Sequence, residues 1–177
     1  MSYVVLVTGG CGQVARALVE RKSCLTYVSC SRSELDITDS DSIAAAFDRI
    51  GPHIVLNAAA YTAVDAAEDN FDKAVAANTR GPYLLSERCA AEMLPLIQLS
   101  TDYVYDGSLD QPYTEEFAAN PAGIYGRTKL EGEDAVRSNL SDHLIIRLSS
   151  VFSGHGKCFP RSILTAALKH RETGCWS

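Results

Sequence analysis

The chain has 177 residues, of which 46% are hydrophobic and 21% are charged, as is ordinary for a globular domain. Its formal net charge is -6, its isoelectric point is about 5.2, and it has no basic run, so we expect no nucleic-acid partner. No apolar run reaches the roughly 18 residues of a membrane span, and Met1-Ser2-Tyr3 lacks the basic start of a signal peptide. We therefore expect a cytoplasmic protein with no membrane partner.

The cysteines and histidines are scattered along the chain, with no C-x-x-C pair and no zinc-finger spacing. This distribution predicts free thiols and no metal site. The six cysteines are Cys11, Cys24, Cys30, Cys89, Cys158 and Cys175, and the four histidines are His53, His143, His155 and His170.

The first predicted element is a buried strand at residues 3–7, a short β-branched run that leads directly into a glycine-rich turn. Gly9 permits the tight bend, Gly12 lets the backbone approach a pyrophosphate, and the following helix offers unpaired N–H groups. Ala15 stands where a third glycine is usual. Alanine is a permitted variant there, because the residue only has to be small where the helix packs on the strand. The turn predicts a nucleotide site, with an ordinary tight turn as the alternative.

The helix after this turn is expected to direct Val14, Leu18 and Val19 inward, and Gln13 and Val14 at its start are candidate cofactor-binding residues.

A second strand is predicted at residues 25–29. An NAD enzyme usually carries an acidic residue after this strand, whereas this chain reads Cys30-Ser31-Arg32. A guanidinium there can bind a 2′-phosphate, so Arg32 favours NADP, and a solvated arginine remains the equal alternative.

Helices and strands continue to alternate through the middle of the chain. Thr38 and Asp41 have the spacing of a capping box for the next helix, which Gly51 and Pro52 end. A third strand at 53–57 follows, then a long helix from about residue 72 to 92, and a fourth strand at 96–100. After the third strand come Ala58, Ala59 and Ala60, small residues that would let a ligand lie close to the backbone.

Repeated strand-helix-strand units form right-handed crossovers, which predict a doubly wound α/β fold with a parallel sheet of the Rossmann type. The ligand crevice of such a sheet lies at the carboxyl ends of its strands. Three candidate clusters come at such strand ends: the glycine turn at Gly9 to Gly12, Asn57, and Ser100 to Asp102. Their shared position is better evidence for a site than any one motif.

The last third of the chain carries a tyrosine and a lysine on one predicted helix. Residues 106–121 read as a loop that covers the site, and a strand at 143–147 and a helix near 162–170 come later. Tyr125 and Lys129 are four residues apart and so share a helix face. An ammonium beside a phenol favours the phenolate, so the pair predicts a proton donor tuned toward neutral pH.

Four motifs in this order resemble the extended short-chain dehydrogenase/reductases, and within them the dTDP-4-dehydrorhamnose reductases. The motifs are Thr8-Gly9-x-x-Gly12-x-x-Ala15, Asn57-Ala58-Ala59-Ala60-Tyr61-Thr62, Ser100-Thr101-Asp102-Tyr103-Val104-Tyr105-Asp106-Gly107 and Tyr125-x-x-x-Lys129.

The resemblance implies hydride transfer from NADP(H), or from NAD(H), to C4 of a 4-keto-6-deoxy nucleotide sugar. Tyr125 would donate the proton, Lys129 would hold the nicotinamide ribose and lower the Tyr125 pKa, and Thr101 would orient the carbonyl oxygen. The cofactor-binding residues that the resemblance adds are Asp36 and Ile37 beside the adenine, Ala58 to Ala60 along the cofactor, and Asn78 behind the lysine.

Two departures from that resemblance are informative. Nucleotide-sugar dehydratases of the superfamily typically read Thr-Asp-Glu where this chain has Thr101-Asp102-Tyr103. The acidic residue needed for water elimination is therefore missing, and a simple reductase fits better. Relatives also continue into a carboxy-terminal lobe that holds the sugar nucleotide and needs roughly 50 residues or more. We expect residues 1–177 to be the NAD(P)-binding domain alone, with the substrate lobe absent and a sheet edge uncovered.

Two other functions stay open at this point. One is a regulatory subunit that binds NADP without catalysis, similar to that of methionine adenosyltransferase, although such a subunit has no need for Thr101, Tyr125 and Lys129 together. The other is an epimerase of the same superfamily, which consumes no net NADPH. The sequence leaves assembly into a homodimer open.

Overall fold

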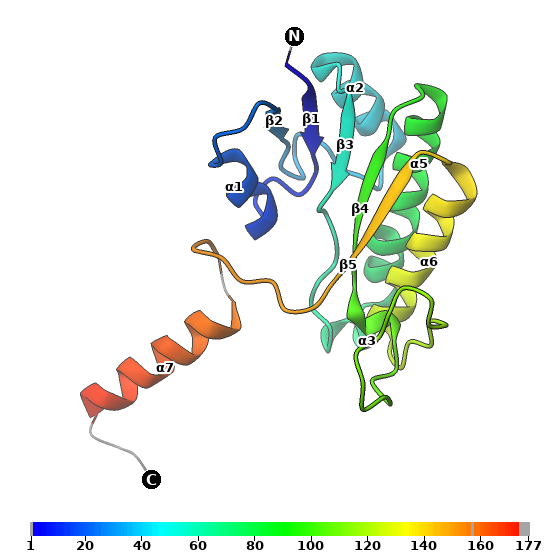
Figure 1. Cartoon of the computed structure of the whole chain (residues 1–177). Helices are drawn as coiled ribbons and strands as arrows, with labels where there is room; N and C mark the ends of the chain where they lie inside the picture. The colour runs from blue at the N-terminus through cyan, green and yellow to red at the C-terminus, as the bar shows by residue number, and fades with distance from the viewer. Residues whose placement is uncertain (1, 157, 174–177) are drawn as a thin grey trace.

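Five apolar runs form one parallel sheet, namely β1 (Val4–Val7), β2 (Thr26–Ser29), β3 (Ile54–Asn57), β4 (Leu96–Thr101) and β5 (His143–Leu148). This computed structural model describes residues 2–156 and 158–173. The strand order is β2-β1-β3-β4-β5, and every neighbouring pair is parallel (Figure 1). The predicted doubly wound parallel sheet is confirmed, and the strands differ from their predicted bounds by one residue at an end.

The sheet order places a switch point between β1 and β3, because the chain leaves β1 toward β2 on one side and returns to β3 on the other. At such a point the loops after the two strands separate and leave a crevice at the carboxyl ends. The helices are α1 (Gln13–Val19), α2 (Ser40–Ile50), α3 (Ala66–Asp69), α4 (Phe71–Val75), the π-helix η1 (Ala76–Arg80), α5 (Gly81–Ala91), the 3-10 helix η2 (Asp102–Val104), α6 (Ile124–Asn139) and α7 (Phe159–Thr173).

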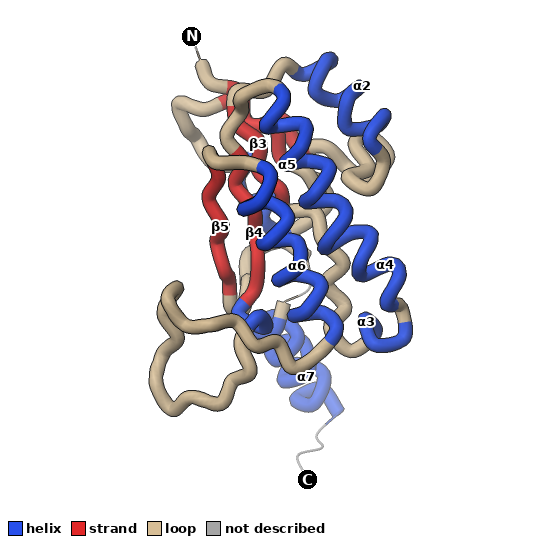
Figure 2. The backbone as a smooth tube through the Cα atoms, turned by 90° about the vertical axis from the view of Figure 1, so that its right-hand side faces the viewer, coloured by secondary structure: helices blue, strands red, loops and turns tan. Residues whose placement is uncertain are grey.

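The two faces of the sheet have separate cores, because successive side chains of a strand point to opposite faces. Val5 and Val7 pack on the face of α1, where Ala15 is fully buried. Leu6 lies in the other core, with residues of α2, α5 and α6. Figure 2 shows these three helices along one side of the sheet. The prediction that Val19 faces inward is wrong: it is 49% exposed, because this short helix touches the sheet through Ala15 and Leu18.

The predicted capping box at Thr38 is also wrong. The helix α2 begins one residue later, with Asp39 as its N-cap and the Asp39 carboxylate 3.0 Å from the Asp41 nitrogen. The Thr38 hydroxyl instead donates to Asp36 at 2.8 Å, a local bond that competes with capping. Gly51 ends the helix as predicted, in the left-handed conformation with φ of 58°.

The long helix predicted at residues 72–92 is interrupted by the π-helix η1. Its wider turn contains Asn78, whose Oδ1 accepts from the Tyr61 nitrogen at 2.9 Å and whose Nδ2 donates to the Thr128 hydroxyl at 3.2 Å. These contacts come from distant segments, which explains why the local pattern showed one helix. Asn78 thereby joins the segment after β3 to α6.

Part of the sheet has no helix over it. Leu144 on β5, an edge strand in the described residues, is 54% exposed. The helix α7, longer than the predicted 162–170, stands away from the sheet (Figure 1). Its residues Ile163 and Leu168 are exposed. Both observations agree with the expectation of an uncovered sheet edge. Among the described residues, no helix is long and apolar enough to cross a membrane.

Candidate active site

Two adjoining cavities lie at the carboxyl ends of β1, β3 and β4, where the topology places the crevice. The first, of about 350 Å³, extends toward the loop after β2, and the second, of about 400 Å³, extends toward α6. They share the glycine turn and the run after β3 as lining, so they form one elongated site. The shared lining residues are Cys11, Gly12, Ala58, Ala59, Ala60 and Thr62.

The glycine turn brings the backbones of β1 and β3 into close contact. Gly9 has φ of 68°, and a Cβ there would lie 2.9 Å from the Ala58 oxygen and from the backbone of Ala59. The Gly12 nitrogen donates to the Gly9 oxygen at 2.8 Å, which closes the turn just before α1. The predicted role of Gly9 in the tight bend has a geometric basis here, since any side chain at Gly9 would meet backbone.

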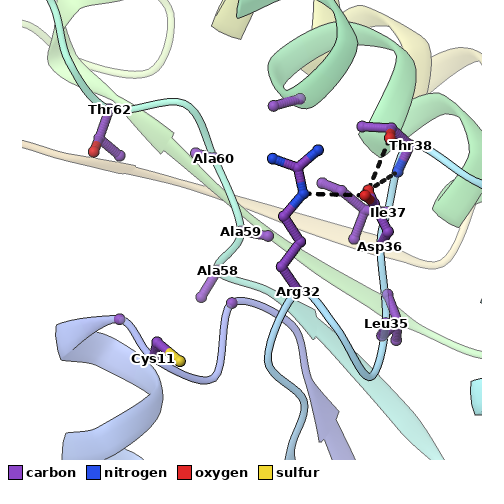
Figure 3. A pocket seen from close by; sticks show the side chains of 13 residues that line it. Cys11, Arg32, Leu35, Asp36, Ile37, Thr38, Ala58, Ala59, Ala60 and Thr62 are labelled. Atoms are coloured by element: carbon purple, nitrogen blue, oxygen red, sulfur yellow. Dashed lines mark hydrogen bonds and ion pairs between the residues drawn. The ribbon is translucent and has the colours of Figure 1, made fainter. Parts of the chain in front are cut away.

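The first cavity contains an arginine and an acid side by side (Figure 3). Arg32 Nε lies 3.0 Å from Asp36 Oδ2, and the arginine side chain is 83% exposed. In Figure 3 its two terminal nitrogens point away from Asp36. Burial raises the pKa of Asp36, but hydrogen bonds from Thr38 and Arg32 outweigh it and lower that pKa overall. Arg32 therefore keeps free donors beside an ionised acid.

The second cavity brings Thr101, Tyr125 and Lys129 together. Thr101 ends β4 and is 5% exposed, and Tyr125 and Lys129 lie on the first turns of α6. The Thr101 hydroxyl donates to Asp102 Oδ1 and accepts from the Tyr103 nitrogen, both at 3.2 Å, and it lowers the pKa of Tyr125. Lys129 Nζ donates to the Leu99 oxygen of β4 at 2.7 Å, which holds α6 against the strand that carries Thr101.

The pKa of Tyr125 is higher than its ordinary value, contrary to the predicted lowering by Lys129. Burial of the phenol is the main cause, the Thr101 hydrogen bond opposes it, and the negative charge of Asp102 adds to it. The ammonium of Lys129 is bound to the Leu99 oxygen instead. Tyr125 is therefore a protonated phenol at neutral pH in this structure.

A chain of buried hydrogen bonds connects the glycine turn to Lys129. The Thr8 hydroxyl accepts from the nitrogens of Ala58 and Ala59, both at 3.1 Å, so its own proton goes to Asn57 Oδ1 at 2.6 Å. Asn57 Nδ2 then donates to Gln98 Oε1 at 2.8 Å, and Gln98 Nε2 to the Leu99 oxygen at 2.8 Å. The oxygen that binds Lys129 thus ends a chain that starts at the turn.

Comparison with known proteins gives the family. A model of the family described as "RmlD substrate binding domain" matches residues 3–174, nearly the whole chain. The chain belongs to the RmlD family.

The RmlD-family chain is similar to several curated proteins. It is 40% identical over 162 residues to a dTDP-4-dehydrorhamnose reductase of Sinorhizobium fredii (strain NBRC 101917 / NGR234), a match that covers 91% of this chain and 55% of that protein. A dTDP-4-dehydrorhamnose reductase of Mycolicibacterium smegmatis is also 40% identical, with 87% and 47% covered. The chain thus spans about half the length of the curated relatives it matches.

Solved structures agree with this assignment. The dTDP-4-dehydrorhamnose reductase of Bacillus anthracis str. Ames, in complex with NADP, superposes with a TM-score of 0.92 at 29% identity, covering 96% of this chain and 61% of that one. The corresponding protein of Clostridium acetobutylicum gives a TM-score of 0.88 at 32% identity, with 94% and 60% covered. The Rossmann-type fold is therefore the fold of the matching half of these reductases.

Most of the predicted site residues of the RmlD-family chain line the two cavities, and Asn78 does not. It is 1% exposed behind Lys129, as a structural link between Tyr61 and Thr128. In the first cavity lie Gly9, Gly12, Arg32, Asp36, Ile37 and Ala58 to Ala60; in the second lie Gly12, Gln13, Val14, Ala58 to Ala60, Thr101, Tyr125 and Lys129.

The loop at 106–121 does not cover the site as predicted, since none of its residues lines either cavity. It packs on itself instead: the rings of Tyr105 and Tyr113 stack at 4.4 Å, and Asp106 accepts from Tyr113 and Asn120. The polar side chains of the loop therefore find their hydrogen-bond partners within the loop rather than at the cavities.

Several lining residues were not predicted. Ser149, Val151 and Gly156 line the second cavity in the segment that follows β5. Their place after the carboxyl end of a parallel strand is the signal that could have found them. Of the cysteines, Cys11 lines both cavities, and the five described cysteines are free thiols. The described residues contain no group of three or more side chains suited to a metal ion.

Replacing Lys129 with methionine is expected to stabilise the fold by about 3.5 kcal/mol at pH 7, since each unit by which burial lowers the pKa of the lysine is worth about 1.4 kcal/mol. Burial lowers the pKa of Lys129 from 10.5 to about 8, and Glu133 only partly opposes this. Below pH 8 Lys129 is protonated in both the folded and the unfolded state, so the full free-energy cost of burying its charge lowers the stability of the fold. The Leu99 oxygen keeps Gln98 as a donor in the variant.

The stability gained by Lys129→Met should shrink as pH rises from 8 toward 10.5. In that range Lys129 loses its proton in the folded state of the unchanged chain but keeps it in the unfolded state, which removes the cost of burying the charge. Urea unfolding at several pH values measures this, with Lys73→Met as the control because Lys73 is exposed. A Lys129→Met variant that is less stable than the unchanged chain at pH 7 would contradict the prediction.

Proposed function

We propose that this chain is the cofactor-binding part of an NAD(P)H-dependent reductase that acts on a 4-keto-6-deoxy nucleotide sugar, namely dTDP-4-dehydrorhamnose. The observation that carries the proposal is the second cavity, where a threonine, a tyrosine and a lysine meet beside the glycine turn. The names of the relatives and the NADP in the Bacillus anthracis structure support it.

The residues present fit a dinucleotide. The tight turn at Gly9 leads to Gly12 just before α1, where the missing side chain leaves the backbone open to a pyrophosphate at the start of the helix. Arg32 and Asp36 in the first cavity would hold the adenosine end, and Lys129 in the second would meet the nicotinamide ribose. When bound, the reduced cofactor supplies a hydride.

Hydride arriving at a carbonyl carbon places negative charge on its oxygen, so the site must donate to that oxygen. Tyr125 is suited to this, because its raised pKa keeps the phenol protonated until the charge develops. The Thr101 hydroxyl lies close to the phenol and can bond the same oxygen. Lys129 would then place a positive charge one helical turn from the phenolate that forms.

We further propose that residues 1–177 form the NAD(P)-binding domain and that the sugar nucleotide is held mainly by the part of the relatives that this chain does not span. This is supported by the cavities, which lie entirely at the carboxyl ends of the sheet, and by the match to about half of each relative.

The test uses the chain alone and the chain joined to the carboxy-terminal remainder of the Sinorhizobium fredii relative. Titration calorimetry of the chain alone should show NADPH binding, and the joined protein should oxidise NADPH when given dTDP-4-dehydrorhamnose. Absence of NADPH binding would refute the cofactor assignment. Binding without oxidation in a folded joined protein would refute the substrate, and an isomerised sugar with no net NADPH use would indicate an epimerase.

Replacing Arg32 with alanine is expected to weaken NADPH binding about 10- to 100-fold, the size of a lost charge-assisted bond of about 1.5–3 kcal/mol. The Arg32 donors that point away from Asp36 are the ones available to a 2′-phosphate. NADH lacks that phosphate and serves as the matched ligand, so its dissociation constant should change little. An equal loss for NADPH and NADH in calorimetry would assign Arg32 to a role other than phosphate binding.

A further inference from the structure

A fully buried carboxylate lies one helical turn beyond Lys129 on the same face of α6. Glu133 has no exposed surface, and its position at i+4 places its Cβ atom about 5–6 Å from that of Lys129. A carboxylate removed from water stays ionised only where several donors meet it. The partners of Glu133 therefore decide whether it carries a charge beside the lysine.

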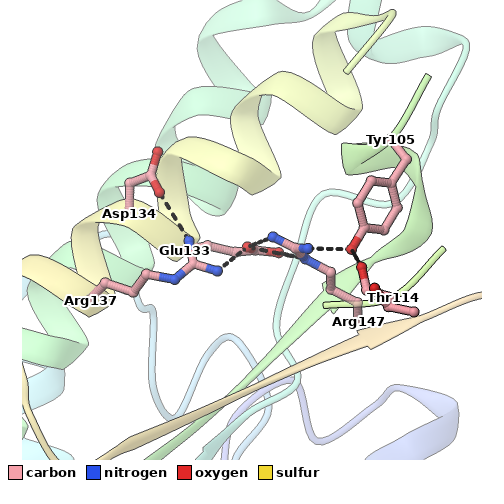
Figure 4. A network of polar contacts seen from close by, with 6 residues as sticks. All are labelled: Tyr105, Thr114, Glu133, Asp134, Arg137 and Arg147. Atoms are coloured by element: carbon pink, nitrogen blue, oxygen red, sulfur yellow. Dashed lines mark hydrogen bonds and ion pairs between the residues drawn. The ribbon is translucent and has the colours of Figure 1, made fainter. Parts of the chain in front are cut away.

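Two arginines hold the Glu133 carboxylate between them (Figure 4). Arg147 of β5 donates to both oxygens, with Nε 3.0 Å from Oε1 and Nη2 2.7 Å from Oε2. Arg137 of α6 donates to Oε2 at 2.7 Å. Burial raises the pKa of Glu133, but hydrogen bonding from Arg147, Ser100 and Arg137 outweighs burial and lowers that pKa overall. The carboxylate is an anion at neutral pH.

The main arginine is itself fixed in place. Arg147 Nη1 donates to the Tyr105 hydroxyl, and its guanidinium carbon lies 5.0 Å from the centre of the Tyr105 ring. The Tyr105 hydroxyl donates in turn to the Thr114 oxygen at 2.9 Å. Because Arg147 is held on both sides, the Glu133 carboxylate has a fixed position relative to α6.

Two carboxylates influence the site residues of α6, Asp102 acting on Tyr125 and Glu133 acting on Lys129. Asp102, beyond the end of β4, is exposed and its charge acts on Tyr125. Burial lowers the pKa of Lys129, and the negative charge of Glu133 opposes this by raising it. The other charged or titratable groups near this pair are Tyr125 on the same helix, Asp102 and Tyr103 beside Tyr125, and Arg147 and Arg137 on Glu133.

We propose that Glu133 is a positioning residue of the site, whose arginine-locked carboxylate keeps the Lys129 side chain in its ammonium form at neutral pH. The role of that ammonium rests on the proposed function, whereas its charge state does not. With a pKa of about 8, Lys129 is protonated in about nine molecules of ten at pH 7. Loss of the Glu133 charge would bring that ratio near or below one, because an opposite charge at this range shifts a pKa by about 1–3 units.

The experiment measures the charge of Lys129 directly, by the shift of its side-chain ¹³Cε signal with pH in lysine-labelled protein. The chain has five lysines, and Lys129→Arg identifies the signal. In Glu133→Gln, which keeps the size of the side chain, the midpoint should fall by at least about one pH unit. Arg137→Gln is the matched control, since it removes a partly exposed partner of the same carboxylate and leaves the carboxylate and Arg147 in place.

A second measurement covers the case in which Glu133→Gln fails to fold because Arg147 is left unpaired. In the unchanged chain, the carboxyl carbon of Glu133 should also show a step at the midpoint of Lys129, which requires no variant.

A midpoint that stays within about 0.3 units in folded Glu133→Gln, or no step at the Glu133 carbon in the unchanged chain, overturns the proposal. In the joined protein, the alkaline limit of kcat/KM should move to lower pH in Glu133→Gln, a change that a purely structural residue does not produce. Because the NMR titration needs neither substrate nor cofactor, a shifted midpoint without any turnover would refute the proposed function and leave this inference standing.

Discussion

Replacing Tyr125 with phenylalanine is expected to lower kcat for NADPH-dependent sugar reduction by about 10²- to 10⁴-fold, the usual contribution of a positioned general acid. The variant loses only a hydroxyl, and the phenylalanine ring can keep the edge contact with Tyr103, whose centroid lies 5.6 Å away. NADPH affinity should therefore change little, which separates a lost proton donor from a damaged site. The measurement is kcat of the joined protein together with calorimetric NADPH binding.

Tyr83→Phe is the control for this substitution. It also removes a phenol hydroxyl, one that donates to Glu87 at 2.6 Å on α5 and lines neither cavity. Its kcat should equal that of the unchanged protein. If Tyr125→Phe retains kcat within about tenfold, proton donation must be assigned to another group, such as the Thr101 hydroxyl.

Replacing Gly126 with alanine is expected to destabilise the chain by about 3 kcal/mol, toward the upper end of overpacking costs. A Cβ at Gly126 would overlap the Tyr103 oxygen and lie 3.0 Å from the Pro121 Cβ. Helix propensity alone predicts the opposite sign, a gain of about 1 kcal/mol for alanine over glycine. The steric term wins because the obstacle is backbone, which cannot rotate away as a side chain could.

The same substitution should also separate Tyr125 from Thr101, because the Gly126 and Tyr103 contact lies between α6 and the end of β4. Urea unfolding measures the stability, and Gly154→Ala is the control, since nothing lies within 4 Å of a Cβ there. A Gly126→Ala chain as stable as the control would show that α6 and η2 can move apart at little cost.

Local patterns were enough to predict the sheet. Each strand is a short run of β-branched and apolar residues, and the alternation with helices left a parallel sheet as the remaining solution. The carboxyl-end rule then placed Gly9, Asn57 and Thr101 at one edge before any distance was known. Boundaries failed where a competing local bond decided them, as at Thr38 and Asp39.

Long-range contacts account for the features that the sequence did not reveal. The π-helix forms where Asn78 reaches Tyr61 and Thr128, and the loop at 106–121 packs on its own tyrosines. Arg32 was predicted as a phosphate ligand without its partner, since the pairing with Asp36 depends on how the chain turns after β2.

By itself, the sequence determined the fold and many of the residues that line the cavities, because strand runs, glycine turns and the i+4 spacing of Tyr125 and Lys129 are local properties of the chain. Only the tertiary structure decided their charge states. Burial, a property of the packed molecule, raises the pKa of Tyr125 and lowers that of Lys129. The carboxylate of Glu133 on α6 opposes the lowering of the Lys129 pKa. It stays ionised mainly because Arg147, fourteen residues later on β5, donates to it.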